Sequence, residues 1–335
     1  MRKLRLIATG GTIACIPTAR GLTPELAADD LLDFVDIDKT NIECMDLFSM
    51  DSSNIQPEEW RILAEAVYAS SQEYDGIIIT HGTDTMAYTA SMLSFMLRGI
   101  GIPVIFTGAQ YPIVYPDSDG RKNLENAVIT AREIAGGGVY VCFGGSIMLG
   151  CRAVKTHTTS LNAFESINYP YIGTVVNGQF IQLHSVHTDG KFSFSRDIDP
   201  SVTLVKLVPG TSANLLGMIS ECGIRGVVVE AFGLGGVHNF RRDHTEILVK
   251  FMEQGIIVIL ASQCLYEPST PDIYEVSRPL KDAGIIPSYD MTTEAAVTKL
   301  MWALGQTSAL EEIRRIMYTN ICGEIDFGAG IKKDG

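Results

Sequence analysis

Short apolar runs that alternate with segments of helical periodicity are the feature that most constrains how this chain can fold. Residues 76–80 read GIIIT, and a short apolar strand of this kind is typical of burial on both faces of a sheet. Residues 85–97 follow with helical spacing. The same pattern predicts strands at 3–9, 102–107 and 139–143 and helices at 57–70 and 123–134. Repeated strand, loop and helix units predict an α/β fold with a doubly wound, mostly parallel sheet and flanking helices.

The second half of the chain repeats this alternation on a smaller scale. Before it, Asn177-Gly178 stands between two β-rich runs and predicts a hairpin. Residues 197–201 are polar and contain Pro200, so we expect a larger N-terminal catalytic domain at 1–196 and a smaller C-terminal α/β domain at 197–335. The elements predicted in the second domain are strands at 202–208, 226–230 and 256–261 and helices at 213–222, 248–253, 293–304 and 310–317.

Composition excludes several classes of protein and partner. The 335 residues are 46% hydrophobic and 19% charged, which is enough apolar material for a folded core. A net charge of −13 disfavours nucleic acid as a partner, because an acidic chain repels phosphate backbones. No apolar run approaches the roughly 18 residues of a membrane-spanning helix, so we expect no membrane partner.

The seven cysteines are odd in number, scattered, and never spaced as C-x-x-C. That pattern predicts reduced, mostly buried thiols rather than disulfides or a zinc site. The N-terminus is basic, but Arg5 interrupts an apolar run that is too short for a signal peptide. We therefore expect residues 3–9 to form a strand and the protein to be cytoplasmic.

Two polar loops follow predicted strands, and ligands of open parallel sheets bind at the carboxyl ends of the strands. In the first loop, Gly10 and Gly11 let the backbone turn sharply, and Thr12 projects from the turn. The second loop, residues 81–85 (HGTDT), offers two hydroxyls and a carboxylate. Each has a purely structural alternative, a tight turn for the first and a helix cap from Thr83 or Asp84 for the second. The G-x-G-x-x-G spacing of a dinucleotide site is missing.

Two further segments carry candidate chemistry. Lys155 lies in RAVKTH with Arg152 and His157 nearby, and like charge and burial both favour a neutral amine that can act as a base. The alternative is an ordinary solvated lysine. Residues 51–54 (DSSN) are dense in hydrogen-bonding groups, with an ordinary loop and helix cap as the alternative.

Together these segments resemble the bacterial-type L-asparaginases, most closely the cytoplasmic type I group, over nearly the whole chain. The motifs that carry the resemblance are TGGTIA at 9–14, MDSSNI at 50–55, ITHGTDTMAYTAS at 79–91, TGAQ at 107–110, RAVKTH at 152–157 and DMTTEAAVTKLMWALG at 290–305. The resemblance implies hydrolysis of L-asparagine to L-aspartate and ammonia through a threonine-linked acyl-enzyme. It implies no metal, no cofactor, and assembly as a homodimer or homotetramer.

The resemblance also implies roles for individual residues. Thr12 would be the nucleophile, with Lys155 as a base, Thr83 as a proton relay, and Asp84 holding the lysine and the substrate amino group. The other residues implied to contact substrate are Asp51, Ser52, Ser53, Gly11 and Ala109. Gly11 and Ala109 would do so through backbone N–H groups that form an oxyanion site.

Some positions depart from the family pattern. Leu22 stands at or near the place of a flap tyrosine, so the activation of Thr12 is left open, and Tyr289 is a candidate contribution from a partner subunit. At the allosteric asparagine site of some type I enzymes, Glu230 and Val154 replace an arginine and a threonine, although Cys264 remains. A carboxylate at Glu230 would oppose that of the ligand, so we expect no such allostery.

Four other functions are weighed against hydrolysis of asparagine alone. A glutaminase-asparaginase of broad selectivity stays open, because the two substrates differ by one methylene. The archaeal tRNA-dependent amidotransferases share the scaffold but carry an extra N-terminal domain, and this chain begins at the catalytic strand. A non-catalytic amino-acid binding module is disfavoured because all four candidate catalytic residues are retained. A nucleotide site is disfavoured because no P-loop is present.

Overall fold

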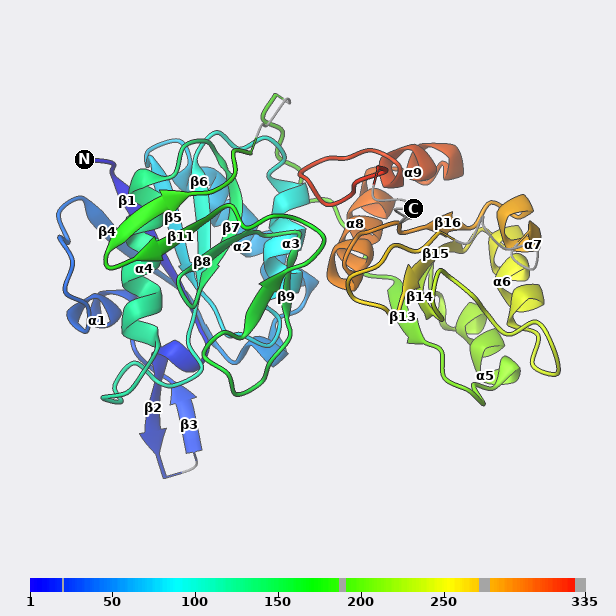
Figure 1. Ribbon diagram of the computed structural model, residues 1–335, viewed down its shortest axis with the longest axis horizontal. Coiled ribbons are helices and arrows are strands. Elements are labelled where there is room, and N and C mark those ends of the chain that lie inside the picture. The colour runs from blue at the N-terminus through cyan, green and yellow to red at the C-terminus, as the bar shows by residue number, and fades with distance from the viewer. Residues whose placement is uncertain (20, 187–190, 271–277, 329–335) are drawn as a thin grey trace, which may run out of the picture. The chain divides into compact units, whose positions relative to one another are not determined.

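The predicted apolar strands form the centre of an eight-stranded sheet in the first of two structural units, Met1–Arg196 (Figure 1). The computed structural model describes residues 1–19, 21–186, 191–270 and 278–328. In spatial order the sheet runs β12-β11-β8-β7-β6-β5-β1-β4. Its parallel strands are β4 (Ile42–Met50), β1 (Leu4–Gly10), β5 (Gly76–Thr80), β6 (Pro103–Thr107) and β7 (Gly138–Phe143). Beyond β7, each strand pairs antiparallel with its neighbour: β8 (Ser146–Leu149), β11 (Gly173–Val176) and β12 (Gln179–Gln182).

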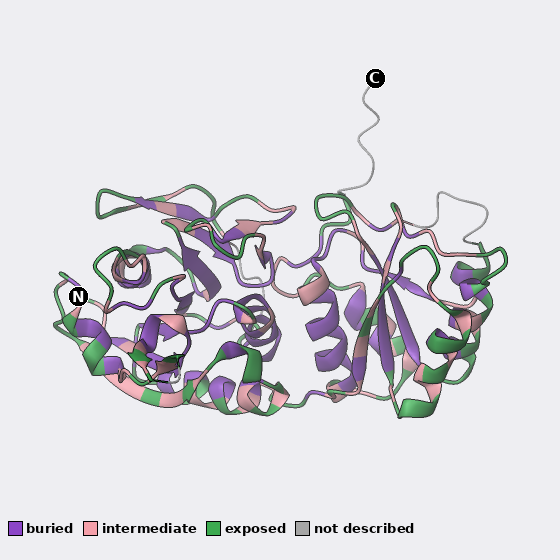
Figure 2. Cartoon of the chain, turned by 90° about the horizontal axis from the view of Figure 1, so that it is seen from below, coloured by how far each residue is buried: buried purple, intermediate pink, exposed green. Residues whose placement is uncertain are grey.

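Helices pack against this sheet at its middle and at its β4 edge. They are α1 (Ala28–Asp33), α2 (Pro57–Ser70), α3 (Met86–Met96) and α4 (Gly120–Glu133). Helix α4 packs on β5, β6 and β7, whereas α3 packs on β7 and α2. Every residue of β5 and β6 is buried, as the apolar run GIIIT predicts. Figure 2 shows buried residues concentrated on the strands and on the inner sides of the helices.

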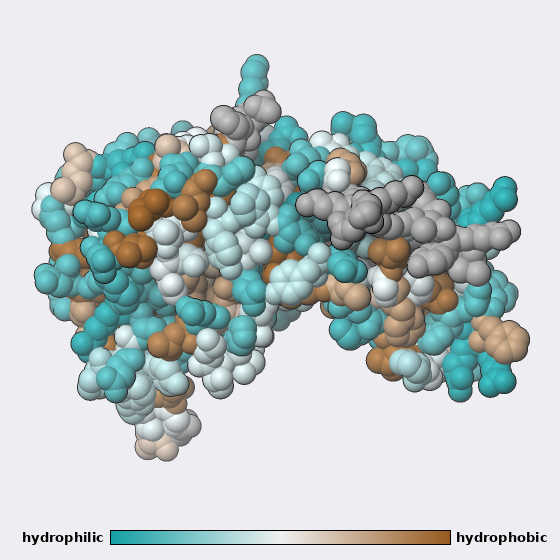
Figure 3. Space-filling model, in the orientation of Figure 1, coloured by the Kyte–Doolittle hydropathy of each residue, from teal (hydrophilic) through white to brown (hydrophobic). Residues whose placement is uncertain are grey.

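Two hairpins extend from the unit. In the predicted one, Asn177 and Gly178 have φ of 50° and 76°, the left-handed pair that a two-residue turn between β11 and β12 requires. The other, β2 (Cys15–Thr18) with β3 (Gly21–Pro24), follows the Thr12 turn and was not predicted. Strand β12 is an edge strand of the sheet, and Figure 3 shows apolar side chains gathered over the β11–β12 hairpin. The exposed ones are Val176, Ile181 and Leu183.

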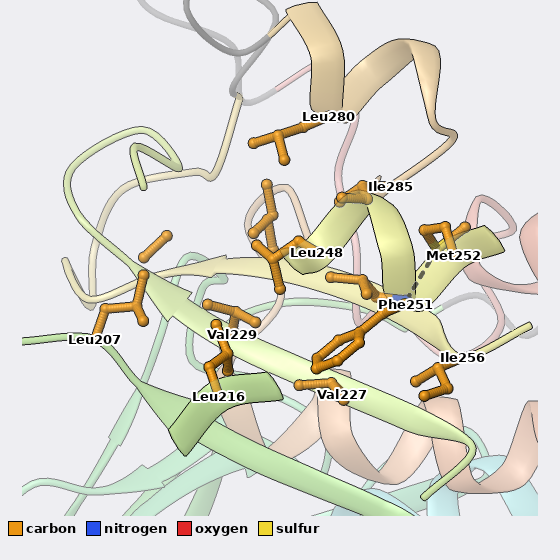
Figure 4. Close-up of a cluster of buried hydrophobic side chains, with 13 residues drawn as sticks. Leu207, Leu216, Val227, Val229, Leu248, Phe251, Met252, Ile256, Leu280 and Ile285 are labelled. Atoms are coloured by element: carbon orange, nitrogen blue, oxygen red, sulfur yellow. Dashed lines mark hydrogen bonds between the residues drawn. The ribbon is translucent and has the colours of Figure 1, made fainter. Parts of the chain in front are cut away.

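The second unit, Asp197–Gly335, has a four-stranded parallel sheet in the order β13-β14-β15-β16. The strands are β13 (Val202–Lys206), β14 (Gly226–Ala231), β15 (Ile257–Ser262) and β16 (Ile286–Pro287). The helices are α5 (Ala213–Gly217), α6 (His244–Glu253), α7 (Arg278–Asp282), α8 (Thr293–Gln306) and α9 (Leu310–Met317). In its core, Leu248 and Phe251 of α6 lie over Val227 and Val229 of β14 (Figure 4).

Two expectations are corrected. The helix predicted over 213–222 is α-helical only to Gly217 and continues as a 3₁₀ helix, Met218–Cys222, because glycine is a poor residue for a helix interior. None of the seven cysteines forms a disulfide, but Cys222 and Cys264 are exposed, so the expectation of mostly buried thiols is too broad. No helix among the described residues is long and apolar enough to span a bilayer.

Candidate active site

Loops from the carboxyl ends of β4, β1 and β5 meet where the glycines of the β1 and β5 loops lie against one another and against Met50 and Ser52. Gly10 and Gly11 have φ of 95° and 76°, a region that favours glycine, and the Gly11 N–H donates to the Met50 carbonyl at 2.8 Å. A Cβ on Gly11 would collide with the backbone of Gly82, and a Cβ on Gly82 would lie 2.6 Å from Ser52 Oγ. The three loops can therefore approach this closely only because these positions lack side chains.

A fourth loop, after β6, joins the same edge. A Cβ on Gly108 would collide with the His81 carbonyl, so this loop also packs through a glycine. His81 is fully buried, and its Nδ1 donates to the Gly82 carbonyl at 2.7 Å. Burial lowers the pKa of His81 to about 4, so the ring is neutral near pH 7 and supports the loop rather than exchanging protons.

Thr12 begins a short 3₁₀ helix, Thr12–Ala14, directly after the two left-handed glycines. Its side chain is partly exposed, and its hydroxyl has no hydrogen-bond partner within the portion of the chain that the structure describes. The β2–β3 hairpin follows, with Leu22 on β3 and 51% exposed. The Thr12 hydroxyl is therefore available to a ligand at the sheet edge.

Lys155 contacts the second threonine loop. It ends β9 (Ala153–Lys155), which pairs with β10 (Phe164–Ser166), and its Nζ lies 2.7 Å from both Thr83 Oγ1 and Asp84 Oδ1. Thr83 is buried and the Lys155 side chain is 15% exposed, so the solvated-lysine alternative is wrong. Among the described residues, the ion pair of Lys155 is with the Asp84 carboxylate, an opposite charge where the sequence suggested like charge from Arg152 and His157.

The helix-cap alternative for the second loop is also wrong. The N-cap residue of α3 is Thr85, and its side chain makes no capping bond. Thr85 Oγ1 instead donates to the Ser52 carbonyl at 2.7 Å, which joins the second loop to the 51–54 segment. Thr83 and Asp84 are thereby left to interact with Lys155.

The 51–54 segment both caps a helix and faces the glycine junction. Asp51 caps the 3₁₀ helix Ser52–Asn54, accepting from Ser53 N at 2.8 Å and Ser53 Oγ at 2.6 Å. The segment does not cap the following helix α2, whose N-cap is Gln56. The Ser53 hydroxyl and N–H lower the pKa of Asp51, which keeps its carboxylate charged. Asp51 and Ser53 are exposed, whereas Ser52 is buried against Gly82.

Sequence reasoning missed Gln110, which follows buried Ala109 after β6. Thr83 Oγ1 lies 3.5 Å from Gln110 Oε1, and the Gln110 N–H donates to both carboxylate oxygens of Asp119 at 3.0 Å. Gln110 lies just beyond the carboxyl end of the buried strand β6, as the Thr12 and Thr83 loops lie beyond β1 and β5, and this position could have identified it from the sequence.

The remaining predicted residues lie in other surroundings. Tyr289 has a φ of 51°, and its ring meets those of Tyr318 and Phe327 edge-on at 6.0 and 5.2 Å. Glu230 accepts from Thr293 Oγ1 at 2.7 Å and pairs with Lys206 at 3.1 Å. Across the described ranges, no three His, Cys, Asp or Glu side chains are placed to hold a metal ion.

Comparison with known proteins agrees with this geometry. Residues 3–187 match the family model described as asparaginase, N-terminal, and residues 201–317 match the glutaminase/asparaginase C-terminal domain. An L-asparaginase of Thermococcus kodakarensis is 44% identical, with 96% of this chain and 99% of that protein covered. A glutamyl-tRNA(Gln) amidotransferase subunit of Metallosphaera sedula is 35% identical over 96% of this chain and 76% of its own length.

Solved structures give the same result. The thermostable L-asparaginase from Thermococcus kodakarensis superposes with a TM-score of 0.91 at 43% identity, covering 96% of this chain and 99% of that one. L-asparaginase I from Vibrio cholerae superposes with a TM-score of 0.84 at 30% identity, covering 97% and 100%.

Proposed function

The chain belongs to the asparaginase family, and we propose that it is an amidohydrolase that converts L-asparagine and water to L-aspartate and ammonia. The observation that carries this proposal is the Lys155 contact with both Thr83 and Asp84 at 2.7 Å, at the sheet edge from which Thr12 projects. The full-length similarity to an L-asparaginase of Thermococcus kodakarensis supports the same substrate.

In the first step, Thr12 Oγ1 attacks the side-chain carbonyl carbon of asparagine. The C–O bond forms, the C–N bond breaks, and the hydroxyl proton ends on the departing nitrogen, which leaves as ammonia. The developing oxyanion needs fixed donors, each worth about 2.7–4 kcal/mol, and the backbone N–H groups of Thr12 and Ala109 are the proposed ones. The Gly11 N–H, which the sequence also suggested, is already bonded to the Met50 carbonyl. Splitting the reaction through an ester replaces one difficult step by two easier ones.

In the second step, water hydrolyses the aspartyl ester. The water oxygen joins the acyl carbon, the bond to Thr12 Oγ1 breaks, and a proton returns to that oxygen. The proposed relay is Thr83 with Lys155, because their side chains are in direct contact and Thr83 is buried. Asp84 holds Lys155 and, in this proposal, also the amino group of the substrate.

Substrate recognition is assigned to charged and polar groups around the glycine junction. Ser52 is proposed to bind the substrate carboxylate, with Asp51 and Ser53 beside it at the amino-acid head. The low pKa of Asp51 supports a charged partner for the ammonium group. These roles suit a substrate with two charged groups and one amide.

Assembly and location extend the proposal. A homodimer or homotetramer is supported by the exposed apolar side chains at the β12 edge, because patches of this kind mark interaction surfaces. In such an assembly residues 197–335 would complete a partner's site, with Tyr289 the candidate contribution. Seven free cysteines support a reducing, cytoplasmic setting.

Two other activities have a specific observation in their favour. The match to a glutaminase/asparaginase C-terminal domain supports broader selectivity, which kcat/KM for asparagine and glutamine would measure. The similarity to a component of an amidotransferase supports delivery of ammonia to a partner enzyme. Ammonia release from free asparagine by this chain alone would favour the hydrolase.

Removal of the proposed nucleophile tests the proposal directly. We expect Thr12→Ala to lower the rate of ammonia release from L-asparagine on the order of 10⁴-fold or more, because no other hydroxyl would form the ester. The matched control is Thr40→Ala, at an exposed loop threonine, which should match wild type. Wild-type rates in Thr12→Ala would contradict the assignment. If the wild type and Thr12→Ala were equally inactive and still bound asparagine, the chain would instead be a binding module.

A further inference from the structure

The side chain of Gln110 connects two parts of the candidate site that lie far apart in the sequence. Its Nε2 donates to the carbonyls of Thr158 and Ser160, both at 3.0 Å, in the loop that follows Lys155. Its Oε1 lies 3.5 Å from Thr83 Oγ1. The Gln110 backbone is fixed independently by Asp119, which accepts from its N–H.

These contacts determine the orientation of the carboxamide. Both hydrogens of Nε2 are used by carbonyl oxygens, which accept and never donate. A flipped amide would place Oε1 against the Thr158 and Ser160 carbonyls and leave two acceptors facing each other. The oxygen of Gln110 is therefore the atom that faces Thr83.

The same reasoning orients the hydroxyl of Thr83. The amine of Lys155 carries donor hydrogens in either protonation state, and its Nζ donates to Thr83 Oγ1 at 2.7 Å. The hydrogen of Thr83 then needs another acceptor, and among the described residues the one in reach is Gln110 Oε1. At 3.5 Å this bond is long, so it orients the hydrogen without holding it firmly.

We propose that Gln110 is a positioning residue of this site, which draws the Thr83 hydrogen away and leaves an oxygen lone pair of Thr83 open toward the reacting groups. Its amide group at the same time ties the loop after Lys155 to the end of β6. This role rests on the proposed hydrolysis, because it concerns the residue that passes the proton of the nucleophile or of water.

Two substitutions separate the two contacts. Gln110→Met is similar in length and removes both, whereas Gln110→Glu keeps an acceptor oxygen toward Thr83 but replaces the donor with an oxygen that can donate to neither loop carbonyl. Gln182→Met is the matched control, because Gln182 also bridges backbone groups, Ala135 N and the His184 carbonyl, away from Thr83. For each purified full chain, kcat and KM for asparagine are measured from about pH 5 to 9, together with the thermal unfolding midpoint.

We expect Gln110→Met to lose about 10- to 100-fold in kcat, less than the roughly 10²–10⁴-fold that a proton-transfer group contributes, because that group is displaced and not removed, with a smaller change in KM. Gln110→Glu should retain more kcat than Gln110→Met, and its added negative charge near Lys155 should move the acidic limb of kcat/KM up by about one pH unit. Gln182→Met should match wild type in both parameters.

Other results overturn the proposal. Wild-type kcat in Gln110→Met would show that the contact has no role. Equal losses in both Gln110 variants, with an unmoved acidic limb and equally lowered unfolding midpoints, would show that Gln110 only holds the loop. Failure of the wild-type chain to release ammonia would instead refute the proposed hydrolysis, so the two failures are distinguishable.

Discussion

Single residues set the geometry of the site by what they lack as much as by what they present. The hydroxyl, amine and carboxylate groups converge because Gly11 and Gly82 let their loops touch backbone to backbone. Neutral His81 stabilises the second loop by donating to the Gly82 carbonyl. Both features lead to measurable effects that do not depend on the substrate.

Adding a methyl group at Gly11 should disrupt the junction. Gly11→Ala would place a Cβ against Gly82 at a φ of 76°, so we expect a destabilisation of about 1–3 kcal/mol and loss of activity. Gly217→Ala is the control, because no atom lies within 4 Å of its Cβ and its φ is −60°, and it should stabilise by about 0.4–1 kcal/mol. Urea unfolding measures both, and equal effects would contradict the steric account.

Protonation of His81 should make the protein sensitive to acid. Its pKa is about 4 when folded and near 6.5 when unfolded, so the unfolded chain binds the extra proton first as pH falls. This contribution is complete above about pH 6.5 and is lost toward about pH 4, at about 1.4 kcal/mol per pH unit. His81→Gln, which cannot titrate, should show a shallower loss of unfolding free energy over that range. An unchanged slope would refute the assignment.

At the scale of elements, the sequence predicts what periodicity encodes and misses what depends on tertiary contacts. The helix Pro57–Ser70 and the strand Gly76–Thr80 have the bounds predicted from their apolar spacing. Strand β4 went unpredicted because its sequence, IECMDLFSM, mixes polar and apolar residues at a half-exposed edge. The loops of Thr12 and Thr83 were found as strand ends, but Gln110 was missed because its contacts reach residues 48 and 50 positions away.

A buried ion pair fastens the C-terminal loop to helix α8. Lys299 and Glu324 are fully buried, 2.6 Å apart, and Lys299 also donates to the Met317 and Thr319 carbonyls. Burial alone would raise the pKa of Glu324, but the Lys299 ammonium and nearby N–H groups hold it below its usual value. The loop is thus held by this buried ion pair in addition to Ile325, which is also buried.

Removing one partner of this pair should destabilise the second unit strongly. Lys299→Met leaves the Glu324 carboxylate buried without its counter-ion, and we expect a loss of about 3–5 kcal/mol in unfolding free energy. Adding Glu324→Leu should recover much of that loss, because no uncompensated charge remains. Chemical denaturation of the three proteins provides the measurement, and a double variant no more stable than Lys299→Met would contradict this account.

At the scale of the whole molecule, the two units differ in what their sheet edges carry. The first unit gathers threonine, lysine and carboxylate groups at one edge, whereas in the second Glu230 is engaged by Thr293 and Lys206. A carboxylate there disfavours an amino-acid ligand, whose own carboxylate it would repel.

Asparagine should therefore not regulate its own hydrolysis in this protein. We expect hyperbolic dependence of rate on asparagine concentration, because Glu230 and Val154 replace groups that the resemblance associates with an effector site, although Cys264 is retained. Steady-state kinetics over a wide concentration range measures this. Sigmoidal kinetics together with a second asparagine bound at Glu230 would refute it.

The order of strands in the first sheet also governs how the protein can be made. Strand β1 leaves the ribosome first, yet it lies between β5 and β4, so both of its edges lack partners until β4 and β5 have been synthesised. Lys155 emerges 72 residues after Thr83. A nascent chain therefore carries the Thr12 and Thr83 loops long before it has Lys155, and until β4 and β5 have been made the apolar strand β1 needs protection from aggregation.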